Sequence, residues 1–210
     1  MKPMKIVIYK KGTIIDFLMN ALRYTSEKLS IRELLMLHHV YIDHGAAATK
    51  ELFDLLNVSE SSITVSTNKL EKLDLIMKAK LDRDKRRVYI LPIEQHIEQI
   101  RKLFCYDESY KLDDIVEFLE YVNDKYKEFS IELLIILYNL YTQKDKAYSI
   151  VHYANLLEFS KPRTSKLIDN ILYKPGLIVK HPSRVSKKLI EISLSDKGVE
   201  LAKDIFEQHY

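Results

Sequence analysis

An internal repeat of about one hundred residues constrains the fold more than any other feature of this 210-residue chain. Residues 52–76, LFDLLNVSESSITVSTNKLEKLDLI, align with residues 153–178, YANLLEFSKPRTSKLIDNILYKPGLI. The apolar positions of the two copies coincide, and the alignment pairs Leu70 with Ile171. In each copy a charged stretch and an apolar-alternating strand follow, and an amphipathic segment ends the copy. A repeat of this size predicts two domains of one fold.

The alignment continues upstream and sets the predicted boundary between the domains. LSIRELLMLHHVYI (29–42) matches FSIELLIILYNLY (129–141) when Arg32 is taken as an inserted residue. We therefore predict a first domain over residues 1–105 and a second over residues 106–210.

Each copy predicts the same order of elements: helix, helix, turn, helix, β-hairpin, helix. Ser30 and Ser130 are typical N-caps of the second helix, and Glu33 stands at the capping-box position. The third helix is predicted at about residues 59–73 and again at about 160–172. Two helices joined by a short turn form a helix-turn-helix, and the hairpin that follows makes the unit a winged helix. The predicted fold class is mainly α with small β-hairpin wings (α+β), as two tandem winged helix-turn-helix domains.

Composition and charge limit the classes of function without selecting one. The chain is 47% hydrophobic and 30% charged, which is typical of globular domains, and its formal net charge is +3. This mildly basic balance fits a nucleic-acid-binding protein and an ordinary globular protein equally well. The single cysteine, Cys105, excludes an intrachain disulfide, and no apolar run approaches the ~18 residues that a membrane span needs. We expect a soluble cytoplasmic protein with no signal peptide and no membrane partner.

The helix-turn-helix and wing segments of both copies carry a family resemblance. They are NVSESSITVSTNKLEKLDLI (57–76) and DKRRVYI (84–90) in the first copy, then FSKPRTSKLIDNILYKPGLI (159–178), SKK (186–188) and ISLSDKG (192–198) in the second. With these motifs the chain resembles the MarR superfamily of winged-helix transcription regulators, with its nearest likeness to the two-domain Sar-type (staphylococcal accessory regulator) proteins. The resemblance implies a covalent pseudo-dimer that binds double-stranded promoter or operator DNA and regulates transcription. Virulence regulation and pairing of chains into a homodimer are left open.

The predicted wings differ between the copies. The family carries an Asp and an Arg two positions apart, and Asp84 and Arg86 occupy those positions. The resemblance implies that Arg86 reaches a minor groove while Asp84 orients basic neighbours. The second copy has Ser186 and Lys188 instead, and Lys lacks the planar fork of Arg. Cationic side chains release counterions from DNA and a narrow minor groove attracts Arg, so both basic wings are predicted to contact DNA.

The predicted recognition helices differ as well. The first offers small polar side chains that can hydrogen-bond phosphates or base edges, although Glu60 would repel phosphate. A basic residue is common in the family where Val65 stands, and the second copy keeps one as Lys166. Because the copies differ at these positions, we predict an asymmetric operator. The predicted DNA-contacting residues are Ser61, Ser62, Thr64, Val65, Asn68, Lys69, Arg83, Asp84, Lys85, Arg86, Arg87, Lys161, Arg163, Thr164, Lys166, Arg184, Lys187 and Lys188.

No combination of residues indicates catalysis, a cofactor or a metal ion. His38 and His39 are adjacent, so on a helix they point to different faces, and His44 adds no matching Cys or carboxylate set. We therefore expect no metal site, no cofactor and no enzymatic activity. Cys105 is interpreted as a structural thiol, with oxidation sensing left open.

Two other functions compete with transcription regulation. A plasmid- or phage-type replication initiator also joins two winged helices, and it would prefer tandem direct repeats of its target. A protein-interaction module would have lost DNA binding, and it would show no affinity for duplex DNA at low salt.

Overall fold

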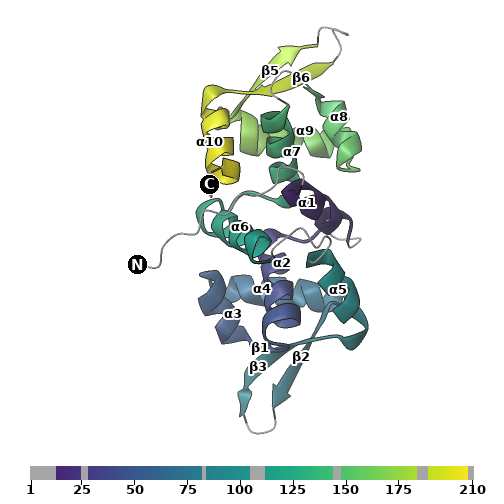
Figure 1. The fold of residues 1–210 in the computed structure, drawn as a ribbon, viewed down its shortest axis with the longest axis vertical. Coiled ribbons are helices and arrows are strands. Elements are labelled where there is room, and N and C mark those ends of the chain that lie inside the picture. The colour runs from purple at the N-terminus through teal and green to yellow at the C-terminus, as the bar shows by residue number, and fades with distance from the viewer. Residues whose placement is uncertain are drawn as a thin grey trace. The chain divides into compact units, whose positions relative to one another are not determined.

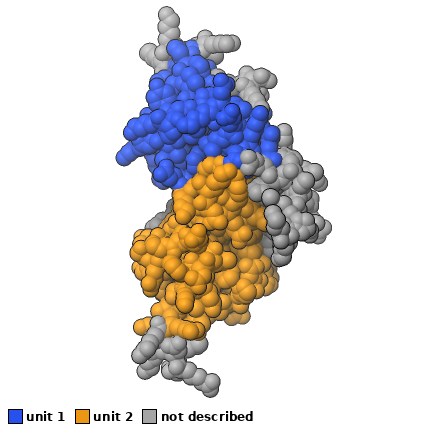
Figure 2. Space-filling model, turned by 90° about the vertical axis from the view of Figure 1, so that its left-hand side faces the viewer, with its two compact units in different colours: residues 1–11, 128–210 blue, residues 12–127 orange. Residues whose placement is uncertain are grey.

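The computed structural model describes residues 13–24, 28–81, 84–104, 112–143, 148–183 and 189–207 (Figure 1). The chain divides into two compact units, which Figure 2 colours separately. The N-terminal unit comprises residues 12–127 and is orange. The C-terminal unit comprises the described residues from 128 onward and is blue.

The N-terminal unit is mainly helical with one small antiparallel sheet. Its described elements are α1 (Thr13–Arg23), α2 (Ile31–His38), the π-helix η1 (His39–Asp43), β1 (Ala47–Ala48), α3 (Thr49–Leu56), α4 (Glu60–Lys72), β2 (Ile76–Leu81), β3 (Asp84–Pro92), the 3₁₀-helix η2 (Glu94–His96), α5 (Ile97–Phe104) and α6 (Leu112–Lys125). The strand order is β1-β3-β2, with Ile90 of β3 paired to both neighbouring strands. The β2–β3 hairpin extends away from the helices of its unit (Figure 1).

The C-terminal unit repeats the part of this arrangement that runs from α2 to α5. Its described elements are α7 (Ile131–Thr142), β4 (Tyr148–Ser149), α8 (Ile150–Leu156), α9 (Lys161–Ile168), the π-helix η3 (Asp169–Tyr173), β5 (Ile178–Pro182), β6 (Ile190–Leu194) and α10 (Asp196–Glu207). The strand order is β4-β6-β5, the counterpart of the first sheet. The predicted fold class, mainly helical with small β-hairpins, is confirmed. None of the helices in the described part of the chain is long and apolar enough to cross a membrane.

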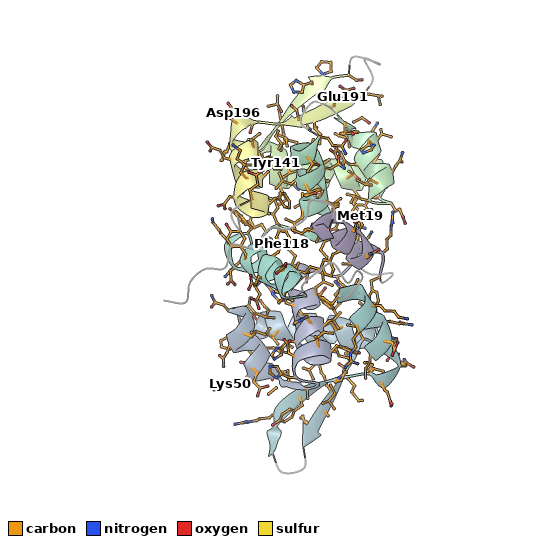
Figure 3. All side chains as sticks on the ribbon, viewed as in Figure 1. Met19, Lys50, Phe118, Tyr141, Glu191 and Asp196 are labelled. Carbon is orange, nitrogen blue, oxygen red and sulfur yellow. The ribbon has the colours of Figure 1, made fainter. Side chains whose placement is uncertain are left out.

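The core of the N-terminal unit forms around α2. Leu34 and Leu37 of this helix are fully buried. The rings of Phe17 in α1 and Phe104 in α5 have centroids 5.5 Å apart. Phe118 of α6, labelled in Figure 3, is fully buried as well. Burial of one large apolar side chain stabilises a fold by ~1.5–3 kcal/mol. The apolar residues that recur along these helices therefore supply the stabilising contacts of this core.

Helix α6 decides where the compact units divide. It packs against α2 and α3, and Val122 on its inner face is fully buried. The Nδ2 group of Asn123 donates to the carbonyl of Leu56 at 3.4 Å. Because of this packing, the division falls between residues 127 and 128. The boundary of the sequence repeat between residues 105 and 106 stays a prediction about the folding domains.

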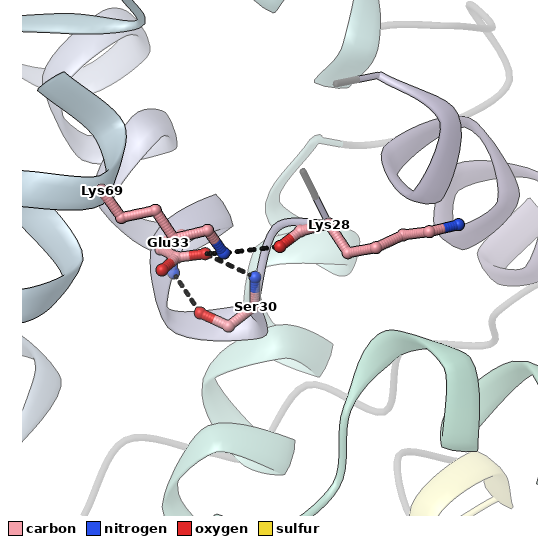
Figure 4. Close-up of polar contacts among 4 residues, drawn as sticks. All are labelled: Lys28, Ser30, Glu33 and Lys69. Carbon is pink, nitrogen blue, oxygen red and sulfur yellow. Dashed lines mark hydrogen bonds and ion pairs between the residues drawn. The ribbon is translucent and has the colours of Figure 1, made fainter. Parts of the chain in front are cut away.

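The N-termini of α2 and α7 fix the register of the first half of the repeat. Ser30 Oγ accepts from the Glu33 amide at 3.2 Å and Glu33 Oε2 accepts from the Ser30 amide at 2.7 Å, which confirms the predicted capping box (Figure 4). Ser130 Oγ accepts from the Leu133 amide at 3.4 Å. Glu33 and Leu133 therefore occupy equivalent positions. The interpretation of Arg32 as an inserted residue is wrong, because in both helices the amide that donates to the N-cap serine lies three residues after that serine.

An extra residue does occur in the third helix of the second copy. The Leu70 carbonyl accepts from the Leu75 amide at 2.9 Å, and the Leu172 carbonyl accepts from the Leu177 amide at 2.8 Å. Leu70 and Leu172 are both fully buried. The predicted pairing of Leu70 with Ile171 is therefore wrong by one residue. The π-helix η3 accommodates the extra residue, because a π-turn bonds residue i to i+5 and holds one residue more than an α-turn.

Candidate functional site

One face of α4 is exposed over two turns of helix. Ser61, Thr64, Val65 and Asn68 lie on it at the spacing i, i+3, i+4, i+7, and all four are exposed. Val65 is 69% exposed although it is apolar. On the opposite side the helix buries Ile63, Ser66, Thr67 and Leu70. The helix therefore has a core-facing side and a polar outward face, which we call the α4 face, defined by Ser61, Thr64, Val65 and Asn68.

Hydrogen bonds near its N-terminus order the α4 face. Ser59 caps the helix by accepting from the Ser62 amide at 3.3 Å. Its hydroxyl also lies 2.9 Å from the hydroxyls of both Ser61 and Ser62. Thr64 donates to the Glu60 carbonyl at 3.0 Å. The small polar groups predicted from the sequence thus lie together at one end of α4, and Ser62 is only half-buried beside them.

Lys69 lies on α4 but points away from the α4 face. Its ammonium donates to Glu33 Oε2 at 2.7 Å and to the Lys28 carbonyl at 2.5 Å (Figure 4). The Lys69 side chain is 28% exposed and that of Glu33 only 6%. We therefore leave Lys69 out of the candidate site, because its charge is used to hold the start of α2 against α4.

A lysine on the β-hairpin contacts the helix that precedes the hairpin in each unit. Lys78 of β2 donates to Asn68 Oδ1 and forms an ion pair with Glu71 at 3.1 Å. Lys180 of β5 forms an ion pair with Asp169, and its ammonium lies 4.6 Å from the centroid of the Tyr173 ring. Sequence reasoning missed both lysines, although the repeat places a Lys two residues after Ile76 and Ile178 in IMKAK and IVKHP. Each lysine fixes its hairpin against its helix.

Strand β3 of the first wing contributes a cation to a hollow beside α4. Arg87 of β3 is exposed, and Lys50, labelled in Figure 3, lies in the first turn of α3. The two cations share the hollow, of about 380 Å³, with one carboxylate. The lining residues are Ala48, Thr49, Lys50, Phe53, Glu60 and Arg87. Positive charge is therefore present next to the α4 face in addition to the polar groups on it.

The tips of both wings lie outside what the structure describes. This applies to Arg83 and to the side chains of Asp84, Lys85 and Arg86, although β3 begins at residue 84. Arg184, Lys187 and Lys188 of the second wing also lie outside the described residues. Cys105, which is not on a wing, lies outside them as well. Their predicted roles stay predictions.

Helix α9 carries exposed cations in its first two turns, and counted from the N-caps only Lys166 is equivalent to a member of the α4 face, Val65. Lys161, Arg163 and Lys166 are all exposed, and the Arg163 guanidinium lies 3.8 Å from the centroid of the Phe159 ring. Thr164 is different, because it is 0% exposed and its hydroxyl donates to the Ser160 carbonyl at 3.2 Å. Its inclusion among the contact residues is corrected, since the side chain belongs to the core.

The repeat itself contains the signal that would have placed Thr164. Counted from the N-caps Ser59 and Ser160, Thr164 is equivalent to Ile63. Ile63 is 1% exposed, so the equivalent position in the second copy is a core position as well.

Comparison with known proteins identifies the fold of the first copy. Residues 29–92 match the family described as "Winged helix DNA-binding domain". Residues 29–92 form a winged helix. A solved structure described as a MepR-like protein complexed with pseudoligands is 19% identical, covers 53% of this chain and 82% of its own, and gives a TM-score of 0.38. The structure of the transcriptional regulator PA4135 is 18% identical, covers 64% of this chain and 89% of its own, and gives a TM-score of 0.35. No curated protein matches the chain significantly.

Proposed function

We propose that this protein is a non-catalytic regulator of transcription that binds double-stranded DNA sequence-specifically. The observation that carries the proposal is the α4 face, an exposed polar stripe on the third helix of a winged helix. A major groove admits an α-helix, and side chains at this spacing face the base edges together. The cations Lys50 and Arg87 beside the stripe provide attraction to the phosphate backbone.

The repeated topology supports a second, tethered contact with DNA. The C-terminal unit has the same strand order, and its helix α9 has the exposed cations Lys161, Arg163 and Lys166 where α4 has Glu60, Ser62 and Val65. Two tethered units reach an effective concentration of roughly millimolar for each other's half-site, so the second contact can be weak alone. We infer a covalent pseudo-dimer of the Sar type within the MarR superfamily, with basic wings on adjacent minor grooves. Because α4 and α9 differ in charge at these equivalent positions, the operator has unequal halves.

Selection from a random duplex library, followed by fluorescence anisotropy at several salt concentrations, tests the proposal. We expect selective binding and a negative slope of log K against log[salt], with about −0.9 contributed by each neutralised phosphate. The enriched sequences should be two dissimilar half-sites about one helical turn apart. Tandem direct repeats would favour a replication initiator, and absence of binding at low salt would favour a protein-interaction module.

A gain-of-charge variant tests the role of the α4 face itself. Val65→Lys introduces at an exposed position the residue that the second copy has as Lys166. We expect roughly fivefold tighter binding at low salt, equivalent to about 1 kcal/mol for one exposed charge pair, and a steeper salt dependence. Gln99→Lys on α5 adds the same charge at an exposed position outside the stripe, and it serves as the control. Equal effects of the two variants would reject direct contact by the α4 face.

A further inference from the structure

Three potential metal ligands converge where α2 ends in the π-helix η1. One ligand atom each from His39, Asp43 and His44 lies within 4.8 Å of the others. His39 Nδ1 is 3.4 Å from Asp43 Oδ2, and the rings of His39 and His44 have centroids 4.4 Å apart. The side chain of His39 is 12% exposed, whereas Asp43 and His44 are exposed. The cluster is thus anchored on the protein and open to solvent on one side.

The π-turn brings these residues together, which is why the sequence did not indicate them. The His44 amide donates to the His39 carbonyl at 3.1 Å, a bond from residue i to i+5. At 3.6 residues per turn, residues five apart on an α-helix would point roughly 140° away from each other. A π-turn holds an extra residue, so the side chains of His39 and His44 approach the same side. Asp43, four residues after His39, supplies a carboxylate as the third ligand of the cluster.

We propose that His39, Asp43 and His44 bind a divalent first-row transition-metal ion, with Zn²⁺ as the best match. Bonds of about 2.0–2.1 Å in tetrahedral geometry place ligand atoms roughly 3.3 Å apart. The 3.4 Å between His39 Nδ1 and Asp43 Oδ2 matches that spacing, and the exposed His44 completes the set within 4.8 Å. Two imidazoles and one carboxylate suit zinc and its neighbours better than the oxygen-preferring Mg²⁺ or Ca²⁺. Three protein ligands leave a fourth position for water.

The surroundings of the cluster favour a cation. His38 Nδ1 lies 3.2 Å from Asp43 Oδ2 and orients the carboxylate, as an outer-shell partner of a metal ligand does. Burial and the neighbouring His44 lower the pKa of His39, while the negative charges of Asp43 and Glu51 oppose that shift. Burial raises the pKa of the Glu120 carboxyl on α6. The negative charges of Asp124, Glu117 and Asp43 raise this pKa further. A divalent ion would relieve this concentration of negative charge.

The metal would stabilise a turn that also supports the wing. Tyr41 lies inside η1, and its hydroxyl donates to the Leu75 carbonyl at 2.5 Å and accepts from the Ile93 amide at 2.9 Å. Leu75 directly precedes β2 and Ile93 directly follows β3. An ion bound by His39, Asp43 and His44 would therefore restrain the same turn that joins both ends of the hairpin.

Titration of the chelator-treated full-length protein with Co²⁺ and Zn²⁺ tests this inference independently of DNA binding. We expect one equivalent of Co²⁺ per chain with a visible absorption band, displacement of Co²⁺ by Zn²⁺, and a micromolar or tighter dissociation constant for Zn²⁺ by calorimetry. Zn²⁺ should also raise the melting temperature of the wild-type protein.

Two variants and one control make the test specific. His44→Gln and Asp43→Asn each remove one ligand from an exposed position, and both should weaken Zn²⁺ binding at least tenfold. Their metal-free melting temperatures report whether they fold. His96→Gln in η2 removes a histidine of the same unit outside the cluster and should bind as wild type does. Absence of stoichiometric binding, or equal affinity in all four proteins, would overturn the proposal.

Discussion

Replacement of Lys69 by Met distinguishes a structural lysine from a DNA-contacting one. The substitution keeps most of the length of the side chain and removes its charge. It leaves two acceptors, the carboxylate of Glu33 and the carbonyl of Lys28, without the ammonium that they share. If Lys69 holds α2 against α4, the main effect falls on stability. If it contacted DNA instead, the main effect would fall on affinity.

The size of the stability loss follows from the geometry. A hydrogen bond that involves a charged group contributes about 1.5–3 kcal/mol. Two features of the site reduce the loss below that of a fully buried pair: Lys69 is 28% exposed, and Glu33 keeps the Ser30 amide at 2.7 Å. We therefore expect the free energy of unfolding to fall by about 2 kcal/mol. At ~2–4 °C per kcal/mol for a chain of this length, the melting temperature should fall by roughly 4–8 °C.

Urea denaturation and thermal melts measure this loss, and anisotropy at a temperature where the variant is folded measures affinity for DNA. Lys102→Met on α5 is the matched control, because that side chain is exposed, and its effect should stay within about 0.5 kcal/mol. A double-mutant cycle of Lys69→Met with Glu33→Gln should show a coupling energy on the order of 1 kcal/mol. The reasoning is refuted if Lys69→Met leaves stability unchanged while it weakens DNA binding.

Two further substitutions probe the wing and the C-terminal core. Tyr41→Phe removes the hydroxyl that joins both ends of the hairpin. Urea denaturation should show that the free energy of unfolding falls by about 1–3 kcal/mol, whereas the control Tyr89→Phe should change it little. Equal effects of the two variants would contradict the role of the Tyr41 hydroxyl. Gly198→Ala places a Cβ 1.9 Å from the Leu177 carbonyl oxygen, which only a backbone shift can relieve. We expect thermal melts to show that Gly198→Ala lowers the free energy of unfolding by about 3 kcal/mol or more. The control Lys203→Ala, at an exposed position of the same helix, should leave it nearly unchanged. An unchanged stability in Gly198→Ala would show that the close contact is absent.

The sequence determined the local features of the fold because they depend on residues within about one helical turn. The capping box of Ser30 and Glu33 is a contact over three positions, and it was predicted from that spacing. The N-cap Ser130 of α7 was predicted in the same way. The repeat added the two-unit organisation, since matching apolar patterns require matching cores. The sequence also identified Ser61 as a small polar residue of the predicted third helix, and this residue is exposed.

Tertiary structure decided where several of the charged and polar side chains point. Lys69 looked like a surface lysine of a recognition helix, but its partner Glu33 is 36 residues away in the sequence. Thr164 looked like a polar contact residue, but it fills the core position that Ile63 has in the other copy. Lys78 was not noticed, because its partners on α4 become neighbours only when the hairpin folds back.

The two π-helices show the same limit in the backbone. A single inserted residue can be placed in a loop or inside a helix, and the choice depends on which side chains the surrounding core must bury. In η3 the core required Leu172 rather than Ile171, so the helix widened by one residue. In η1 the widened turn brought His39 and His44 together. Sequence alone determined which elements form and what they can offer chemically. The packing of those elements decided which side chains meet, because side-chain direction depends on contacts far apart in the chain.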